Sequence, residues 1–286
     1  MANAQPITLA LPKGRMFSSL IALLAQSGLV IRDHERSYRP TTPDPRLALK
    51  VLKPQNIPAL VDLGRHDLGF SGHDWIVETG SAVVELDDLE LEPVDLVAAA
   101  AESWQPPKQS AAPVVVASEY ENIAKRFLES KGWPHRFVRS YGATEVFPPE
   151  DADLIIDNSA TGQTLKEHGL RVVEKIMTSS TRFIGSERSL ARPEVRQFAE
   201  DLVLLMRGVR AAQSRVMLEM NLVDGNLEEI IRLLPAMKSP TVSQLADGSH
   251  VLKAAVPQAD VPRLVPRLKQ LGASDILEYP IRKVIP

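Results

Sequence analysis

Short apolar runs alternate with stretches of helical periodicity along the first two-thirds of the chain. The apolar runs predict buried strands at residues 7–11, 67–70, 94–101, 114–117, 136–139, 153–156, 170–176 and 180–184. Helical spacing of apolar residues predicts helices at residues 16–28, 54–64, 75–79 and 119–131. This alternation is typical of an α/β protein with parallel sheets covered by helices on both faces.

A different pattern follows a long predicted helix at residues 193–215. Strands are predicted at residues 216–222, 240–245, 251–256 and 276–279, and helices at 227–237 and 260–271. Asp247-Gly248 predicts a hairpin turn between the second and third of these strands. The resulting order, βαββαβ, is that of a ferredoxin-like unit. Because this unit carries no cluster of acid, base and nucleophile, we interpret it as regulatory or oligomerising.

These patterns divide the chain into three parts. Residues 1–102 form a first lobe, and residues 103–179 form a second lobe that begins with a polar, proline-containing connector at 103–113. Residues 180–213 return to the first lobe, and residues 214–286 form the C-terminal domain.

Three loops with small or charged residues follow predicted strands. They are Lys13-Gly14-Arg15, the stretch 71–74 with Ser71 and Gly72, and the loop within DLIIDNSATGQTLKEHG, residues 153–169. Ligands of open α/β sheets bind beyond the carboxyl ends of the strands, and backbone N–H groups before a helix favour phosphate. We therefore expect one cleft between two lobes. Each loop alone is also compatible with helix capping, turn geometry or solvated charge.

Composition narrows the function classes. The chain has 286 residues, a formal net charge of −3 and no long basic run, which argues against a nucleic-acid partner. The absence of cysteine excludes disulfides and thiol catalysis, and the six histidines have no ligand-like spacing for structural zinc. No stretch approaches a membrane span, and the first residues lack a signal-peptide pattern, so we expect a cytoplasmic protein.

Four stretches together resemble ATP phosphoribosyltransferase in its long form. They are ITLALPKGR (7–15), DLGFSGHDWI (67–76), DLIIDNSATGQTLKEHGL (153–170) and LVPRLKQLGASDILEYPIRKVI (264–285). The resemblance implies that adenine N1 of ATP attacks the anomeric carbon of phosphoribosyl pyrophosphate, while pyrophosphate leaves with Mg²⁺. It implies a two-lobed catalytic part like type II periplasmic binding proteins, an ACT-like domain that binds histidine as inhibitor, and a homo-oligomer, from dimer to hexamer.

The resemblance also assigns roles to residues. The phosphate and ribose are expected at Asp157, Asn158, Ser159, Ala160, Thr161, Gly162, Gln163 and Thr164. Among these, Asp157 is expected to accept hydrogen bonds from ribose hydroxyls, and residues 159–164 are expected to hold the 5-phosphate. ATP and pyrophosphate are expected at Lys13, Gly14, Arg15, Ser71 and Gly72, and histidine at Ser239, Thr241 and Ala273. No catalytic nucleophile and no metal ligand is assigned, since adenine N1 carries its own lone pair and positioning with charge stabilisation suffices.

Two positions depart from the family pattern. Ala160 stands where the family usually has serine, which removes one hydroxyl but keeps a backbone N–H. Glu92-Pro93-Val94-Asp95 stands where relatives tend to have glycine and a basic residue, which leaves Lys13 and Arg15 with more of the positive charge. Two alternatives stay open: a bilobal solute- or effector-binding protein, and a catalytically silent regulatory paralogue.

Overall fold

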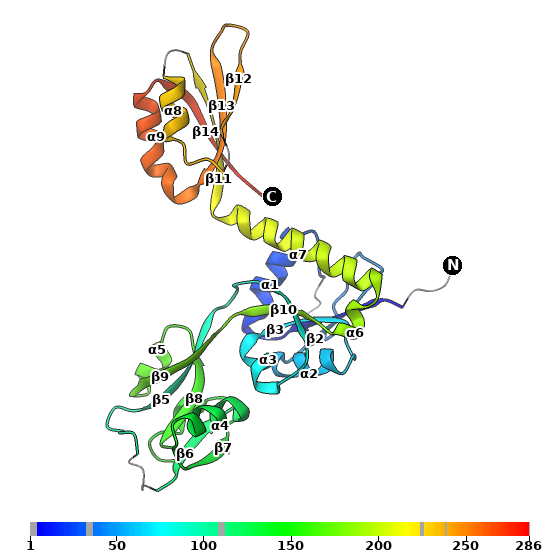
Figure 1. Cartoon of the computed structure of the whole chain (residues 1–286), viewed down its shortest axis with the longest axis vertical. Helices are drawn as coiled ribbons and strands as arrows, with labels where there is room; N and C mark the ends of the chain where they lie inside the picture. The colour runs from blue at the N-terminus through cyan, green and yellow to red at the C-terminus, as the bar shows by residue number, and fades with distance from the viewer. Residues whose placement is uncertain (1–4, 33–36, 108–111, 224–225, 238, 286) are drawn as a thin grey trace. The chain divides into compact units, whose positions relative to one another are not determined.

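The computed structural model describes residues 5–32, 37–107, 112–223, 226–237 and 239–285. It divides into two compact units, one of residues 1–25 and 29–200 and the other of residues 26–28 and 201–286 (Figure 1). Each unit has its own sheets and core. No helix within the described ranges is long and apolar enough to cross a membrane.

The first sheet of the N-terminal unit has the strand order β2-β1-β3-β10-β4. Strands β1 (Ile7–Pro12), β2 (Leu47–Leu52) and β3 (Leu68–Gly72) are parallel, whereas β10 (Thr181–Gly185) runs antiparallel to both β3 and β4 (Val84–Asp88). The helical segments of this part are α1 (Arg15–Gln26), η1 (Pro54–Asn56), α2 (Ile57–Asp62), α3 (His73–Thr79), α6 (Glu187–Leu190) and the start of α7 (Pro193–Gln213).

The second sheet of the same unit has the order β7-β6-β8-β5-β9. Strands β6 (Val114–Ser118), β7 (His135–Arg139) and β8 (Leu154–Ser159) are parallel, and β5 (Val94–Ala101) runs antiparallel to β8 and to β9 (Leu170–Ser179). Its helical segments are α4 (Glu121–Ser130), η2 (Thr144–Val146) and α5 (Gln163–Glu167). The chain crosses between the two sheets twice, from β4 to β5 and from β9 to β10, as the ribbon shows (Figure 1).

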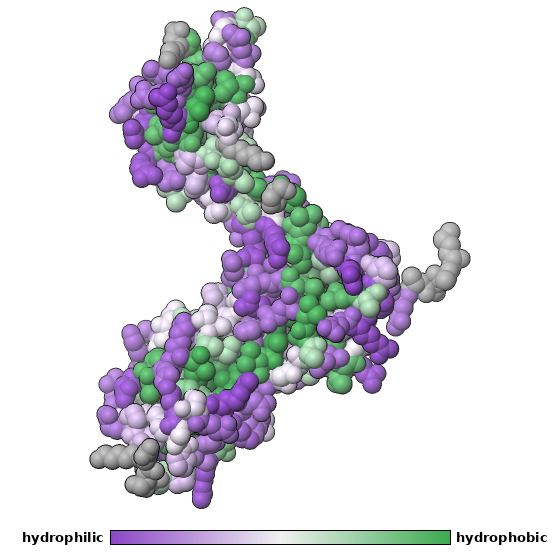
Figure 2. Space-filling view, viewed as in Figure 1, coloured by the Kyte–Doolittle hydropathy of each residue, from purple (hydrophilic) through white to green (hydrophobic). Residues whose placement is uncertain are grey.

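Strand β8 shows why these strands are apolar on both sides. Ile156 packs in a cluster with Tyr120 and Phe127 at α4, whereas Ile155 packs in a different cluster with Leu165 of α5. Because helices cover both faces of the sheet, the sequence of this strand is a continuous apolar run instead of an alternation of apolar and polar residues. In the space-filling view, hydrophobic residues accordingly gather over the strands of this sheet, with hydrophilic residues around them (Figure 2).

A half-buried carboxylate ties the start of the first sheet to the segment that returns to it. Asp67 accepts hydrogen bonds from the backbone N–H and the hydroxyl of Thr8 (2.8 and 2.9 Å), from Ser189 Oγ (2.9 Å) and from Arg192 Nη1 (2.9 Å). Four donors, from Thr8 and from the segment 189–192, offset the cost of removing this carboxylate from water.

The C-terminal unit has the predicted βαββαβ order. Its elements are β11 (Arg215–Leu222), α8 (Leu227–Leu233), β12 (Thr241–Gln244), β13 (His250–Pro257), η3 (Gln258–Asp260), α9 (Val261–Gln270) and β14 (Ala273–Pro280). The sheet is antiparallel, with the order β12-β13-β11-β14. Alternate residues of β11, such as Leu218 and Met220, are buried, and they pack in one cluster with Leu264 and Leu268 of α9. This alternation is what a sheet with helices on one face requires.

The structure confirms the α/β class and corrects several details. The sheets are mixed, because β10 and β5 enter them antiparallel. Strand β8 ends at Ser159 and not at Ile156, since backbone pairing of Ser159 with Asp95 does not depend on side-chain polarity. Strand β5, placed by the sequence in the first lobe, pairs in the second sheet. The lobe boundaries remain a prediction. Strand pairing favours a boundary between the first and second lobes that lies between β4 and β5, instead of after residue 102.

Candidate functional site

The carboxyl ends of four parallel strands meet at a cavity of about 320 Å³ in the N-terminal unit. Strand β1 leads to Lys13, β3 ends at Gly72, β6 is followed by Glu119 and Tyr120, and β8 contributes Asn158. The full lining is Lys13, Arg15, Met16, Pro54, Gln55, Gly72, Asp74, Trp75, Glu92, Val94, Glu119, Tyr120, Asn158, Ser179 and Ser180. Both sheets therefore contribute to the cavity, which lies beyond strand ends, where ligands of α/β sheets bind.

Two cations stand at the β1 side of this cavity. Lys13 directly follows β1, and its Nζ donates to the hydroxyl of Tyr38 (3.0 Å) while lying 5.0 Å from the centre of the Tyr38 ring. This ammonium lowers the pKa of the Tyr38 hydroxyl. Arg15 begins α1, and its Nε lies 3.6 Å from Glu92 Oε2. Gly14 between them has a φ of +88°, which only glycine adopts readily.

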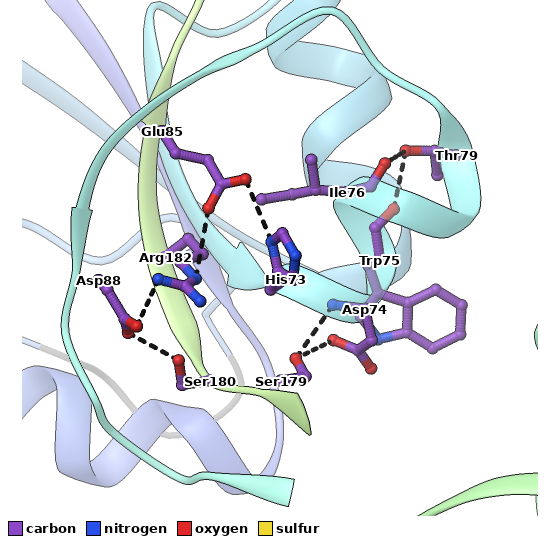
Figure 3. Close-up of polar contacts among 10 residues, drawn as sticks. All are labelled: His73, Asp74, Trp75, Ile76, Thr79, Glu85, Asp88, Ser179, Ser180 and Arg182. Atoms are coloured by element: carbon purple, nitrogen blue, oxygen red, sulfur yellow. Dashed lines mark hydrogen bonds and ion pairs between the residues drawn. The ribbon is translucent and has the colours of Figure 1, made fainter. Parts of the chain in front are cut away.

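A buried hydrogen-bond network joins the two sheets at the cavity. Asp74 of α3 accepts from Ser179 Oγ at the end of β9 (2.7 Å, Figure 3) and from the hydroxyl of Tyr120 (2.6 Å). The backbone N–H of Asp74 donates to Ser179 Oγ, and Asn158 Nδ2 donates to the Tyr120 hydroxyl (3.2 Å). Burial, then the charge of Asp74, raises the pKa of the Tyr120 hydroxyl, so this group stays protonated and donates.

Packing holds the same network in place. The rings of Trp75 and Tyr120 stack with centres 4.3 Å apart, although one comes from α3 and the other precedes α4. A Cβ at Gly72 would lie 2.1 Å from Asp74 Oδ1, so glycine is required here by the carboxylate that folds back over it. Glu78 of α3 accepts from the backbone N–H groups of Asn122 and Ile123 and so caps α4.

A second polar chain supports Ser180, the residue between β9 and β10. Ser180 Oγ donates to Asp88 (2.6 Å), which pairs with Arg182, and Arg182 also pairs with Glu85 (3.3 Å; Figure 3). Glu85 Oε1 in turn lies 3.1 Å from Nδ1 of His73. Ser179 and Ser180, at the crossing from β9 to β10, therefore both donate to carboxylates, those of Asp74 and Asp88.

Asp157 and the loop after β8 lie beside the cavity and are not among its lining residues. Successive strand residues point to opposite faces, so Asn158 faces Tyr120 while Asp157 lies on the face of Ile155. Burial raises the pKa of the Asp157 carboxyl to about 6, and Glu145 and Glu119 add to this, against hydrogen bonds from the Asn158 backbone and from Thr144. The Asp157 carboxylate is therefore costly to hold without a further donor.

The loop between Ser159 and Thr164 is a hydroxyl-rich turn. Ser159 Oγ accepts from the backbone N–H of Gly162 (3.0 Å), and Thr161 Oγ1 accepts from that of Gln163 (3.4 Å). Gly162 has a φ of +73° and precedes α5. The predicted free N–H groups are thus used in part by the loop's own hydroxyls. The side chains of Ala160, Thr161, Gln163 and Thr164 are exposed.

The structure brings together four residues of the predicted set, Lys13, Arg15, Gly72 and Asn158, at one cavity. Ser71 is fully buried in β3, where its hydroxyl donates to the backbone oxygen of Pro54 (2.9 Å), so that hydroxyl has a structural partner. The sequence analysis missed Asp74, Trp75, Glu119, Tyr120 and Ser179. The rule that directed attention to strand ends, applied to β6, would have found Glu119 and Tyr120.

The three predicted effector residues are not close together in one copy of the chain. Thr241 begins β12 at one edge of the C-terminal sheet and is exposed, whereas Ala273 begins β14 at the other edge. Ala273 is 1% exposed and packs in the core with the helices, and Ser239 is exposed. One small ligand that touched both edges would have to bridge two copies, since the edges are three strand spacings, about 14 Å, apart.

Comparison with known proteins gives consistent matches over the whole chain. The family model described as ATP phosphoribosyltransferase matches residues 53–207, and that described as HisG, C-terminal domain, matches residues 212–283. The chain is 38% identical over 299 residues to the ATP phosphoribosyltransferase of Chlorobium phaeovibrioides (strain DSM 265 / 1930). It is 34% identical over 293 residues to that of Nitratidesulfovibrio vulgaris (strain DSM 19637 / Miyazaki F), with 100% of each chain covered in both matches.

A solved structure agrees with these matches. The ATP phosphoribosyl transferase (HisG:HisZ) complex from Thermotoga maritima contains a chain that is 27% identical, with a TM-score of 0.63. That match covers 70% of the present chain and 98% of the other.

Proposed function

Because this chain belongs to the ATP phosphoribosyltransferase family, we propose that its cavity holds the polyphosphate of a substrate and that the adjoining loop after β8 holds the phosphoribosyl group. The family reaction joins the anomeric carbon of phosphoribosyl pyrophosphate to N1 of ATP and releases pyrophosphate. The chain is accordingly a transferase of the first step of histidine biosynthesis.

The observation that carries this assignment is the convergence of Lys13 and Arg15 with four strand ends at one cavity. A triphosphate or pyrophosphate brings several negative charges, and such groups bind where cations and strand ends meet. Arg15 offers a planar fork for two oxygens, and Lys13 offers a point charge. Both are exposed to solvent, so an entering anion can reach them.

The phosphoribosyl group fits the region of Asp157 and the loop 159–164. A carboxylate with a raised pKa and a shortage of donors gains most from the two hydroxyls of a ribose. The exposed hydroxyls of Thr161 and Thr164 are placed on the solvent side of the loop, where a 5-phosphate can accept from them. These assignments place the sugar next to the cavity, on the other side of β8 from Asn158.

Positioning and charge account for the chemistry that the chain has to supply. The Tyr120 hydroxyl and the Asp74 carboxylate are committed to each other and to Ser179 and Asn158, so they hold the two sheets in register at the cavity. The reaction needs no protein nucleophile, because adenine N1 attacks directly. The cations stabilise the pyrophosphate as it leaves.

The described residues hold no group of three or more His, Cys, Asp or Glu side chains that could bind a metal ion. Mg²⁺ commonly binds through one or two carboxylates together with substrate phosphates. The site therefore fits a metal ion that enters with the substrate's phosphates. Among the cavity carboxylates, Glu119 would be the one to hold it, since within the described ranges its Oε2 accepts only from Gln55 Nε2 (3.3 Å), whereas Glu92 lies 3.6 Å from Arg15. When bound, Mg²⁺ neutralises the charge of the pyrophosphate.

We further propose that the C-terminal unit binds histidine as an inhibitor and that the chain works as a homo-oligomer. The ferredoxin-like unit has no cavity-lining residue of the catalytic site, which suits a regulatory role. The exposed Ser239 and Thr241 are the predicted effector residues that a ligand can reach, whereas Ala273 is buried. Light scattering with and without histidine measures the oligomer.

The test is the formation of phosphoribosyl-ATP by the full chain with ATP, phosphoribosyl pyrophosphate and Mg²⁺. Arg15→Met should lower kcat/KM by at least tenfold, whereas Arg65→Met, which removes an exposed cation outside the cavity, should leave it unchanged. A folded chain that binds both substrates without turnover would support the silent paralogue. Binding of an unrelated small solute without either substrate would support the bilobal binding protein.

A further inference from the structure

Arg15 is in contact with an acid that belongs to the same cavity. Its Nε lies 3.6 Å from Glu92 Oε2, and both residues line the cavity together with Lys13. The two side chains are 49% and 29% exposed, so water reaches the pair and the attraction between them is weak. The Glu92 carboxylate thus pairs with the guanidinium that a polyphosphate would bind, and the pair is weak enough to separate.

The backbone around Glu92 is held firmly. Glu92 has a φ of +50°, in the left-handed region that non-glycine residues rarely adopt. The segment is fixed on the returning strand, because the backbone oxygen of Leu91 accepts from both the N–H (3.0 Å) and the hydroxyl (3.2 Å) of Thr181. Leu89 N–H donates to the oxygen of the same Thr181. The Glu92 side chain is therefore presented to the cavity from a fixed backbone.

We propose that the Glu92 carboxylate is an internal competitor for Arg15 that sets the affinity of the cavity for polyphosphate anions. A phosphate oxygen and the carboxylate seek the same guanidinium, and they repel each other at close range. An incoming polyphosphate therefore has to displace Glu92 from Arg15. This inference rests on the proposed role of the cavity, and it concerns affinity and selectivity for the anion, not the bond-forming step.

The competition makes the cavity selective for anions that carry a metal ion. A polyphosphate complexed with Mg²⁺ has less net negative charge, so it meets less repulsion from Glu92 than the free anion does. Removing the Glu92 charge should therefore favour the free anion more than the metal complex. The effect should weaken with salt, because both side chains are accessible to solvent.

The experiment is calorimetric titration of the full chain with inorganic pyrophosphate, with and without Mg²⁺. Glu92→Gln keeps the shape of the side chain and should lower the Kd of free pyrophosphate by roughly threefold to tenfold at low salt. The gain in affinity should be smaller for magnesium pyrophosphate. It should also shrink when the NaCl concentration is raised roughly tenfold, to about 0.5 M, because salt screens the repulsion. The matched control is Glu174→Gln, which changes the net charge equally but removes a carboxylate that pairs with Lys131 outside the cavity.

A second pair of variants ties the effect to Arg15. In the Arg15→Met background, Glu92→Gln should improve binding by far less than in the wild-type chain, and unfolding midpoints show whether each variant is folded. An unchanged or raised Kd in Glu92→Gln, an equal gain in Glu174→Gln, or no pyrophosphate binding at all would overturn the proposal. The assay for phosphoribosyl-ATP tests the function separately: a chain without turnover whose pyrophosphate affinity still rises in Glu92→Gln would refute the function and support the competition.

Discussion

Replacing Tyr120 by phenylalanine removes one oxygen from the centre of the network that joins the two sheets. The hydroxyl donates to Asp74 Oδ2 at 2.6 Å, in a place where Tyr120 is 1% exposed. The stack on Trp75 is retained, because phenylalanine has the same ring. The substitution therefore isolates one charge-assisted hydrogen bond from the packing around it.

The expected loss is about 2–3 kcal/mol, the usual cost when a buried charged acceptor loses a donor. Asp74 keeps its bond from Ser179 Oγ, which limits the loss. The partly exposed amide of Asn158 also loses its acceptor, and water can replace it there. For a unit of about 200 residues, this corresponds to a fall in Tm of roughly 4–12 °C.

Tryptophan fluorescence during urea unfolding reports on the right part of the chain. The three tryptophans, Trp75, Trp104 and Trp133, all belong to the N-terminal unit. Tyr141→Phe is the control, since Tyr141 is 89% exposed. In the Asp74→Asn background, Tyr120→Phe should cost less, because a neutral amide oxygen is a weaker acceptor. Equal midpoints for Tyr120→Phe and Tyr141→Phe would refute the reasoning.

The remaining predictions concern the sugar loop, the fold and the effector. The affinity for phosphoribosyl pyrophosphate should fall as the pH decreases through about 6, because the ionised Asp157 carboxylate is a stronger acceptor for ribose hydroxyls than the protonated group. Asp157→Asn should bind weakly at every pH. Without ligand, the same raised pKa means that the free energy of unfolding, relative to Asp157→Asn, falls as pH rises from about 4 to about 6 and then levels. Thr161→Val should weaken the binding of phosphoribosyl pyrophosphate by about 1.5–3 kcal/mol and the binding of ATP much less, as measured in equilibrium titrations. Asp67→Asn should lower the unfolding free energy of the N-terminal unit by about 2–4 kcal/mol in urea. Thr241→Ala should raise the histidine concentration needed for half-inhibition without changing the uninhibited rate.

Each of these has an outcome that contradicts it. A pH-independent affinity of the wild-type chain for phosphoribosyl pyrophosphate would show that Asp157 does not bind the ribose. Equal losses of affinity for both substrates in Thr161→Val would show that Thr161 does not bind the 5-phosphate. Wild-type stability in Asp67→Asn would show that its four donors find other partners. Unaltered histidine inhibition in Thr241→Ala would show that Thr241 does not contact the effector. Ala273→Leu is not a suitable effector variant, because Ala273 is buried in the core and a larger side chain would disturb the fold.

Local sequence patterns predicted most of the elements correctly. Apolar runs found β1, β3, β5, β6 and β8, because strands covered on both faces by helices need no polar residues. The hairpin at Asp247-Gly248 and the βαββαβ order also followed from short-range signals. The predicted ends of β8 and α8, at residues 156 and 237, were wrong, since these elements end at Ser159 and Leu233. Backbone pairing and packing, not side-chain polarity, decide where an element stops.

By itself, the sequence determined that Lys13, Arg15, Gly72 and Asn158 stand at or next to the carboxyl ends of strands. Only the tertiary structure decided which residues from distant segments meet. Asp74 and Tyr120 are 46 positions apart and share a hydrogen bond, and Glu92, in the segment that crosses from β4 to β5, lies 3.6 Å from Arg15. The structure also placed Asp157 and Asn158 on opposite faces of β8. The physical reason is that periodicity and turn chemistry act over a few residues, whereas a partner across two sheets depends on the register and packing of the whole unit.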